Sequence, residues 1–218
     1  NDNELKNFLS EESRCSKIQI QKFINKDFEF QLLGCSLNSG EEIIIPGRTH
    51  IERPKGLDNT FFLSFDKIEQ NLEDLVEKAK IFVRQTGYSG PFSIEFLRDK
   101  DNGLDFFLEM NFRNDGNAYC VTAAGCNIPY LIYLYYSGGD YKSELSRSSV
   151  RKVFLMPEFY YFKRMLALEV SPSEFIRNLR RTNCFTTYFR EDKKPFVFFM
   201  FKTMWNAIKA LGKLLGIK

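Results

Sequence analysis

The chain has 218 residues, of which 44% are hydrophobic and 16% aromatic, which is enough to bury the core of one domain or of two small ones. Its 31 lysines and arginines against 28 aspartates and glutamates leave a net charge of only +3. This composition predicts a globular protein and argues against nucleic acid as a partner, because there is no strong basic excess to bind phosphates.

The first segments along the chain read as the end of a helix followed by strands. Residues 4–10 have a helical pattern, and residues 16–24 and 27–37 have the character of strands. The turn sequence "NSGEE" then leads to a hairpin partner at residues 43–47. Residues 48–60 are polar, contain proline and glycine and carry three cations, so we expect a loop there.

A long helix and a second hairpin follow. Between Lys67 and Gly87 the apolar residues recur at helical spacing, and Gly87 is a natural end for the helix. Residues 92–98 and 104–111 have strand character and are joined by the turn "DKDNG". This order of elements predicts a mixed α and β domain with an antiparallel sheet.

Helices dominate the sequence beyond Pro129. The aromatic segment "YLIYLYYSGGDY" is the first of them, and "EFYYFKRMLAL" and "SPSEFIRNLRR" are two more. The last of these opens with Ser171 as its N-cap and Pro172 in its first turn.

The tail, residues 196–218, is apolar and basic. At helical spacing Phe198, Phe201 and Trp205 share one face, with lysines opposite, and the chain from Lys193 onward has no acidic residue. Such a helix either lies on an anionic membrane surface or packs on its own domain or on a second subunit. Peripheral membrane association and a homodimer therefore both stay open.

Polar side chains alternate with apolar ones in the stretch "LDFFLEMNFRNDGNAY". Glu109, Asn111 and Arg113 fall on one face of this strand. If "DKDNG" closes a five-residue loop, Glu95 faces Phe107 and lies diagonally across from Glu109, ~7–8 Å away. Two carboxylates and an amide oxygen suit magnesium or manganese, and the arginine suits a phosphate.

The alternative is an ordinary half-exposed sheet, in which polar and apolar residues alternate without any ligand. The surrounding phenylalanines favour the metal site. They indicate burial on both sides, and a buried pair of carboxylates is costly unless the two share a cation.

Two blocks of the sequence carry a resemblance. "GYSGPFSIEFL", followed after a hairpin by "FFLEMNFR", resembles the paired metal-binding strands of the ATP-grasp superfamily, and "IQIQKFINKDFEFQLLG" resembles its hinge strand and the strand after it. The blocks have the superfamily's order and separation and together cover residues 4–145. The resemblance implies an α+β fold, with an antiparallel sheet flanked by helices and a helical C-terminal extension. It divides the chain into the end of a truncated first lobe (1–17), a catalytic lobe (18–145) and the extension (146–218).

The resemblance also implies roles for individual residues. Glu95, Glu109 and Asn111 match the ligands of Mg²⁺ (or Mn²⁺), and Arg113 matches an arginine that contacts phosphate or acyl-phosphate.

The nucleotide site implied by the resemblance begins at the hinge. The residues that match the adenine-contacting hinge are Gln21, Lys22, Phe23 and Ile24. Asp27 or Glu29 would approach the ribose hydroxyls of ATP, and the loop cations Arg48 and Arg53 are candidates for the triphosphate or acyl-phosphate. The hinge usually offers a glutamate where this chain has Gln21, although an amide can still accept from the exocyclic amine.

The activity implied is that of an ATP-dependent carboxylate–amine ligase, in which a small-molecule carboxylate is activated as an acyl-phosphate and a nucleophile then displaces phosphate. The superfamily's substrate-binding domain and first ATP lobe have no counterpart here, so we expect the chain to be the C-terminal part of a longer protein and inactive alone. Residues 171–197 resemble the tail of bacterial ligases of the carbamoyl-phosphate-synthetase-like type, some associated with surface-polysaccharide pathways. The alternative is a non-catalytic nucleotide-binding or membrane-associated assembly module.

The histidine and the cysteines carry no catalytic pattern. His50 lies between Arg48 and Arg53, and incidental contact with solvent or substrate is a plainer reading than a catalytic base. The five cysteines show no CxxC pair and no zinc spacing, and Cys120 and Cys126 read as small buried residues. Reduced thiols, together with the lack of a signal-peptide pattern and of any apolar run near ~20 residues, predict a cytoplasmic protein.

Overall fold

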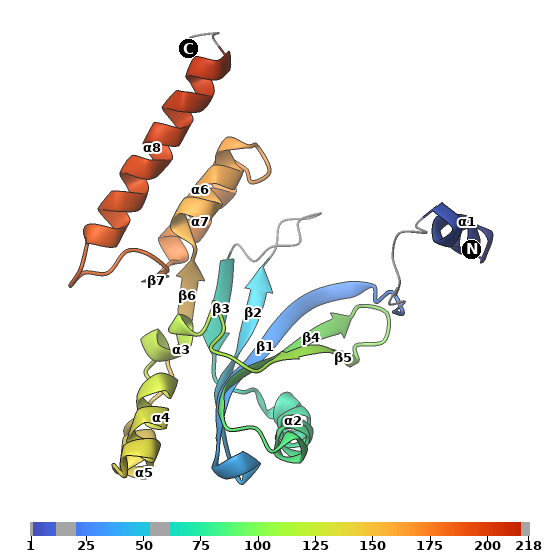
Figure 1. The fold of residues 1–218 in the computed structure, drawn as a ribbon, viewed down its shortest axis with the longest axis vertical. Helices are drawn as coiled ribbons and strands as arrows, with labels where there is room; N and C mark the ends of the chain where they lie inside the picture. Colours follow the sequence, from blue (N-terminus) through green and yellow to red (C-terminus); the bar gives the residue numbers. More distant parts are fainter. Residues whose placement is uncertain (1, 12–20, 53–61, 215–218) are drawn as a thin grey trace.

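The computed structural model describes residues 2–11, 21–52 and 62–214. Within these ranges one mixed sheet has the strand order β5-β4-β1-β2-β3-β6-β7, and all neighbouring strands are antiparallel except β6 and β7 (Figure 1). The strands are β1 (Lys26–Leu37), β2 (Glu42–Glu52), β3 (Phe62–Asp66), β4 (Gly90–Asp99), β5 (Asp105–Asn111), β6 (Val153–Met156) and β7 (Cys184–Phe185). The helices are α1 (Asp2–Glu11), η1 (Asn38–Gly40), η2 (Gln70–Leu72), α2 (Glu73–Thr86), α3 (Tyr119–Ala124), α4 (Ile128–Ser137), α5 (Tyr141–Arg147), α6 (Glu158–Leu166), α7 (Pro172–Arg181) and α8 (Lys194–Leu214).

Helices cover both faces of the sheet, because successive side chains of a strand point to opposite sides. On one face Phe30, Leu32 and Ile94 form a core with Val76 and Val83 of α2. The core on the other face packs against α3, α4 and α5, and its buried strand residues are Leu33, Cys35, Leu37, Ile51, Leu63, Phe65, Val153, Leu155 and Cys184. Figure 1 shows α2 and the α3–α5 group on opposite sides of the sheet.

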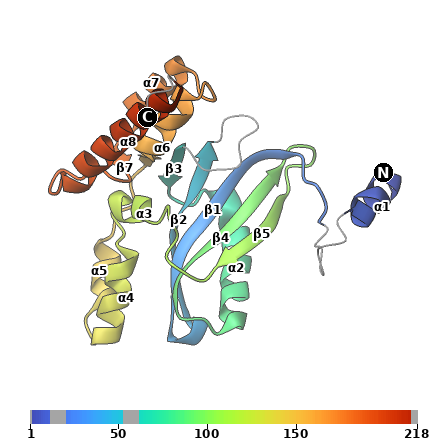
Figure 2. The same cartoon turned by 45° about the horizontal axis from the view of Figure 1, so that its top comes forward.

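A smaller core lies at the β3–β6 end of the sheet. Phe62 and Met156 pack there with Tyr161 and Val170, on the same face as α2. The buried Asn178 of α7 donates a hydrogen bond of 2.7 Å to the Tyr161 hydroxyl, so this polar pair is satisfied inside the core. Figure 2 shows α6, α7 and α8 grouped beyond this end.

Several predicted elements are confirmed. β1 and the β4–β5 hairpin agree closely with their predicted ranges, and the predicted helix forms as η2 and α2. Gly87 ends α2 in the left-handed conformation with φ +63°. The α+β fold class is confirmed as well.

The segment after the first hairpin was predicted wrongly in part. Residues 48–52 continue β2 instead of starting a loop, and β2 pairs with β3, which the sequence pattern did not reveal. β2 alternates buried Thr49 and Ile51 with partly exposed polar residues, and this polarity resembles that of a loop. Of the strand predicted at 16–24, residues 16–20 lie outside the described ranges, and residues 21–24 have no regular secondary structure.

Four cysteines, Cys35, Cys120, Cys126 and Cys184, are free and buried, as predicted for Cys120 and Cys126. Burial, with a further contribution from the neighbouring Cys126 thiol, raises the pKa of Cys35 to about 12. Burial followed by the charge of Glu158 raises the pKa of Cys184 to about 12. Because the thiolate is the reactive form, these residues act as small apolar side chains and not as nucleophiles.

Ser171 caps α7 as the sequence predicts. Its hydroxyl accepts a hydrogen bond of 3.1 Å from the Glu174 backbone N–H. We expect Ser171→Ala to lower the free energy of unfolding by about 1 kcal/mol and the midpoint of thermal unfolding by ~2–4 °C. Circular dichroism during heating measures this loss. Ser149→Ala, at an exposed position outside the helices, is the control, and an equal loss in both variants would argue against the cap.

Candidate nucleotide and metal site

The face of the sheet that packs against α3–α5 continues as a polar surface along three strands. Strand alternation and pairing place the following residues of β1, β4 and β5 on it: Glu29, Gln31, Ser93, Glu95, Glu109 and Asn111. Met110 points to the opposite face and packs in the α2 core. The predicted carboxylates and amide therefore do share one face.

The register of the β4–β5 hairpin differs from the predicted one. Glu95 lies directly opposite Glu109, not opposite Phe107. The strands shift by one residue between the pairs Phe96–Phe107 and Glu95–Glu109, where Leu108 is the extra residue of a β-bulge. The pairing also begins one residue later than a five-residue loop gives, with Arg98 opposite Asp105. Side chains directly opposite are closer than diagonal ones, so the loop and the bulge together bring the two carboxylates nearer than the sequence suggests.

Amide side chains hold the two carboxylates in place. Gln31 Nε2 donates to Glu95 Oε1 at 2.8 Å, and Asn117 Nδ2 donates to Gln31 Oε1 at 3.1 Å. Asn111 Nδ2 donates to Glu109 Oε1 at 2.9 Å and reaches Glu95 Oε1 at 3.5 Å. Asn111 thus bridges the pair, and Gln31 fixes Glu95 from the neighbouring strand.

The local charge is strongly negative. Burial raises the pKa of Glu95 above its usual value, the Gln31 hydrogen bond opposes this rise, and the charges of Glu109 and Asp115 add to it. Asp115, in the loop after β5, accepts a hydrogen bond of 3.1 Å from the Ser93 hydroxyl. A cation placed between Glu95 and Glu109 would relieve the repulsion between them.

The donor set suits a hard divalent cation whose remaining ligands are phosphate oxygens and water. Within the described residues no three His, Cys, Asp or Glu side chains are grouped as a metal cage. Glu95 and Glu109 with the amide of Asn111 form a sparser set, and magnesium commonly binds to one or two carboxylates plus substrate phosphates. Zinc and copper fit poorly, because neither sulfur nor imidazole is present in this set.

The site is an open surface. Glu109 is exposed on β5, which is an edge strand of the sheet, so the predicted burial on both sides is wrong. The cavity of about 480 Å³ between α3 and residues 183–191 is a separate feature, since neither carboxylate lines it. The candidate metal site is therefore the open face that carries the two carboxylates, and not this cavity.

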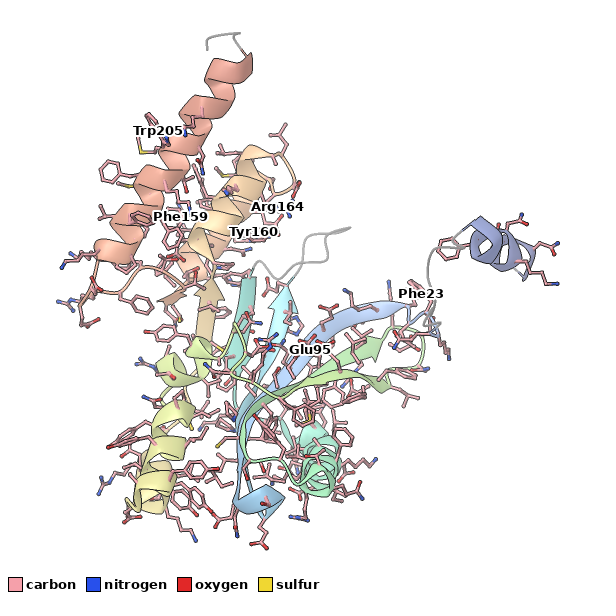
Figure 3. The ribbon with its side chains drawn as sticks, viewed as in Figure 1. Phe23, Glu95, Phe159, Tyr160, Arg164 and Trp205 are labelled. Carbon is pink, nitrogen blue, oxygen red and sulfur yellow. The ribbon has the colours of Figure 1, made fainter. Side chains whose placement is uncertain are left out.

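The predicted hinge runs beside the tip of the β4–β5 hairpin. The hinge residues Gln21, Lys22 and Phe23 are exposed, and Ile24 is half-buried. Lys22 Nζ lies 5.7 Å from the centre of the Phe106 ring of β5. Figure 3 shows Phe23 projecting from the chain just before β1.

The remaining predicted nucleotide contacts are at the start of β1 and in the loop after β5. Asp27 is exposed, and half-buried Glu29 forms an ion pair of 2.8 Å with Lys26 Nζ. Glu29 shares the polar face with Gln31. Arg113 is exposed, two residues beyond Asn111.

The structure does not bring Arg48 to the carboxylates. Arg48 pairs across the sheet with Leu32 and lies on the α2 face, where it forms an ion pair of 2.5 Å with Glu69. His50 is on the same face, 4.7 Å from the Phe28 ring. Burial, and next the charge of Arg48, lower the pKa of His50. Arg53 lies outside the described residues.

Sequence reasoning missed Gln31, Asp115 and Asn117. Each is far from Glu95 in sequence or lies in a loop, so no short motif joins them to it. Gln31 had a usable signal, because it is a polar residue between the apolar Phe30 and Leu32 in a predicted strand.

The fold and the paired carboxylates define an α+β domain with a candidate metal site on the face of its sheet. No protein-family profile matches the sequence, and no curated protein matches it. Among solved structures, biotin carboxylase from Campylobacter jejuni in a β,γ-ATP complex is similar, with a TM-score of 0.52 and 18% identity over 62% of this chain. Pyruvate carboxylase from Rhizobium etli is similar with a TM-score of 0.50 and 12% identity over 64% of this chain. The chain has the ATP-grasp fold, and it spans 30% and 15% of the lengths of those two chains.

Proposed function

We propose that this chain supplies the metal-binding half of an ATP-dependent ligase that activates a small-molecule carboxylate as an acyl-phosphate. The observation that carries the proposal is the pairing of Glu95 with Glu109, bridged by Asn111, on the open face of an ATP-grasp sheet. An amine or another nucleophile would then displace phosphate. The association with surface polysaccharides stays a prediction of the sequence resemblance.

Each residue of the site would have a distinct task. Mg²⁺, when bound, neutralises phosphate oxygens and favours transfer of the terminal phosphoryl group to the carboxylate. Glu95 and Glu109 would hold the ion through their carboxylate oxygens, and Asn111 through its amide oxygen after it turns from its present hydrogen bonds. Gln31 keeps Glu95 oriented. The exposed Arg113 would contact the transferred phosphoryl group.

The nucleotide would lie along the polar face toward the hinge. Phe23 and Lys22 stand near the tip of the hairpin, where an aromatic ring and a backbone edge could receive adenine. Glu29, on the same face as Gln31, is the better placed of the two candidates for the ribose hydroxyls, because Asp27 lies at a shift in the β1–β4 register.

Calorimetric titration with ADP tests the site. We expect ADP to bind this chain more tightly when Mg²⁺ is present. Glu109→Gln should lower the affinity for ADP in the presence of Mg²⁺ at least about tenfold, because it removes a ligand of the ion. Glu77→Gln makes the same change on α2, where Glu77 forms an ion pair with Lys80 at the surface. ADP binding that is equal with and without Mg²⁺, or unchanged in Glu109→Gln, would refute the metal site.

A further inference from the structure

Among the side chains of α8 that the structure describes, those that contact the rest of the protein lie on one side of the helix. Within the described residues, Phe196 and Phe199 of α8 lie 5.2 and 6.0 Å from the Phe159 ring of α6, and Tyr188 also contacts Phe196. Figure 1 shows α8 beside α6 and apart from the sheet. These ring contacts lie in the first two turns of α8, a helix of 21 residues.

The opposite side of α8 exposes large apolar side chains, which we call the α8 stripe. At 100° per residue they share one side of the helix. The members and their exposed fractions are Val197 41%, Phe198 63%, Phe201 62%, Met204 54% and Trp205 58%. Figure 3 shows Trp205 directed away from the sheet. A row of side chains of this size in water is far outside the scattered exposure that is normal for a surface.

A second element exposes apolar residues at the same end of the molecule. The connection from α6 to α7 carries Leu166, which is 61% exposed, and Leu168, which is 86% exposed. Leu168 has φ +61°, a conformation that a leucine rarely adopts. Figures 1 and 2 both place this connection at the end toward which α8 extends. Two segments distant in sequence thus present apolar side chains in one region.

The charge of the tail is entirely positive. From Lys193 to Lys218 the sequence holds six lysines and no acidic residue. Lys209 Nζ lies 5.3 Å from the Trp205 ring, and Lys202 Nζ lies 6.0 Å from the Phe199 ring. Lys209 therefore lies beside the α8 stripe at Trp205, and Lys202 lies at its border with the α6-facing Phe199. A long side chain at the edge of the stripe can reach headgroups while the rings enter the acyl boundary.

We propose that the α8 stripe, together with Leu166 and Leu168, lies in the interface of an anionic lipid bilayer. Charge complementarity selects this occupant, because lysines beside the stripe meet anionic headgroups favourably. A second copy of the chain fits less well, since a symmetric contact through the stripe would bring like-charged lysine edges together. No helix within the described residues is long and apolar enough to span a bilayer, and the proposed contact lies along the surface.

Trp205 is the single tryptophan of the chain and lies in the α8 stripe, so it reports on the contact directly. The full chain is mixed with phosphatidylcholine vesicles with and without phosphatidylglycerol. We expect co-sedimentation, a blue shift of Trp205 emission and quenching by brominated lipids only with the anionic vesicles, all weakened by high salt. Equal binding to neutral vesicles, or no quenching with anionic ones, would overturn the proposal.

A pair of matched variants separates the stripe from general hydrophobicity. Phe198→Gln/Phe201→Gln leaves Trp205 in place and should reduce vesicle binding at least ~10-fold. Tyr133→Gln/Tyr136→Gln removes two rings of α4 that are each 64% exposed and should leave binding unchanged. Circular dichroism checks that both variants remain folded. Equal losses in both variants overturn the proposal, and so does a blue shift that grows with protein concentration without lipid, which would indicate a second copy.

Discussion

Glu95→Gln should make the metal-free chain more stable while removing its magnesium-dependent binding of ADP. Burial and the charge of Glu109 oppose ionisation of Glu95, so its neutral isostere relieves a repulsion that the folded state otherwise bears. The glutamine keeps an oxygen to accept from Gln31 Nε2. We expect a gain of about 1 kcal/mol at pH 7, which corresponds to ~2–4 °C in the thermal midpoint of a chain of this size.

The stability gain of Glu95→Gln should depend on pH. Because the pKa of Glu95 is raised in the folded state, its contribution to stability is present at acid pH and is lost as pH rises through the folded pKa. The stability gain of Glu95→Gln should therefore be largest at neutral pH and vanish toward acid pH. Thermal unfolding from pH 4 to pH 7 measures the difference.

Glu77→Gln on α2 again provides the control, since it removes a surface carboxylate without changing the site. A structural role for Glu95 predicts the reverse result, with Glu95→Gln less stable than the wild type at every pH. Retained magnesium-dependent ADP binding in Glu95→Gln would contradict its assignment as a ligand even if the stability gain is seen.

Gly34→Ala should destabilise the fold by about 2–3 kcal/mol and lower the thermal midpoint by ~4–12 °C. Gly34 lies in β1 where the register with β2 shifts between Leu33 and Cys35. The extra residue of β2 brings the Ile44 carbonyl oxygen over Gly34, so a Cβ added at Gly34 would overlap this oxygen. The same Cβ would lie 3.0 Å from the Phe92 ring. Because the neighbours are a backbone carbonyl and a buried ring, neither can move away from the added methyl group without disturbing the packing around it.

Gly116→Ala is the matched control for this substitution. No atom lies within 4 Å of a Cβ added at Gly116, so we expect a change within about 0.5 kcal/mol. Chemical denaturation of both variants gives the free energies directly. Similar stabilities for Gly34→Ala and the wild type would show that β2 can move away from β1, and the bulge would then not be rigid.

The sequence was informative about the site where local rules decide the structure. Glu109 and Asn111 fall on one face because strand alternation is fixed, and "DKDNG" joins β4 to β5 as turn chemistry predicts. The bulge at Leu108 could not be anticipated, because one extra residue leaves the alternation on either side intact. It shifts the register by one residue, and the start of the pairing at Arg98 and Asp105 supplies the second residue of the shift that sets Glu95 opposite Glu109.

Longer-range features were beyond local rules. Gln31 is 64 residues from Glu95, and only the pairing of β1 with β4 brings them together. Arg48 was a candidate for the nucleotide because its segment read as a loop. Once that segment is a strand, buried Ile51 marks the face of Glu29, and Arg48 must point to the other side.

The buried thiols also alter what the cysteines say about where this protein works. Reduced cysteines predict a cytoplasmic protein on the assumption that the surroundings keep the thiols reduced. Within the described residues, burial itself protects Cys35, Cys120, Cys126 and Cys184, since an oxidant in solvent meets neither the sulfur atoms nor the thiolate form. The same four side chains would stay unmodified in an oxidising compartment, so their reduced state does not indicate the compartment in which the protein works.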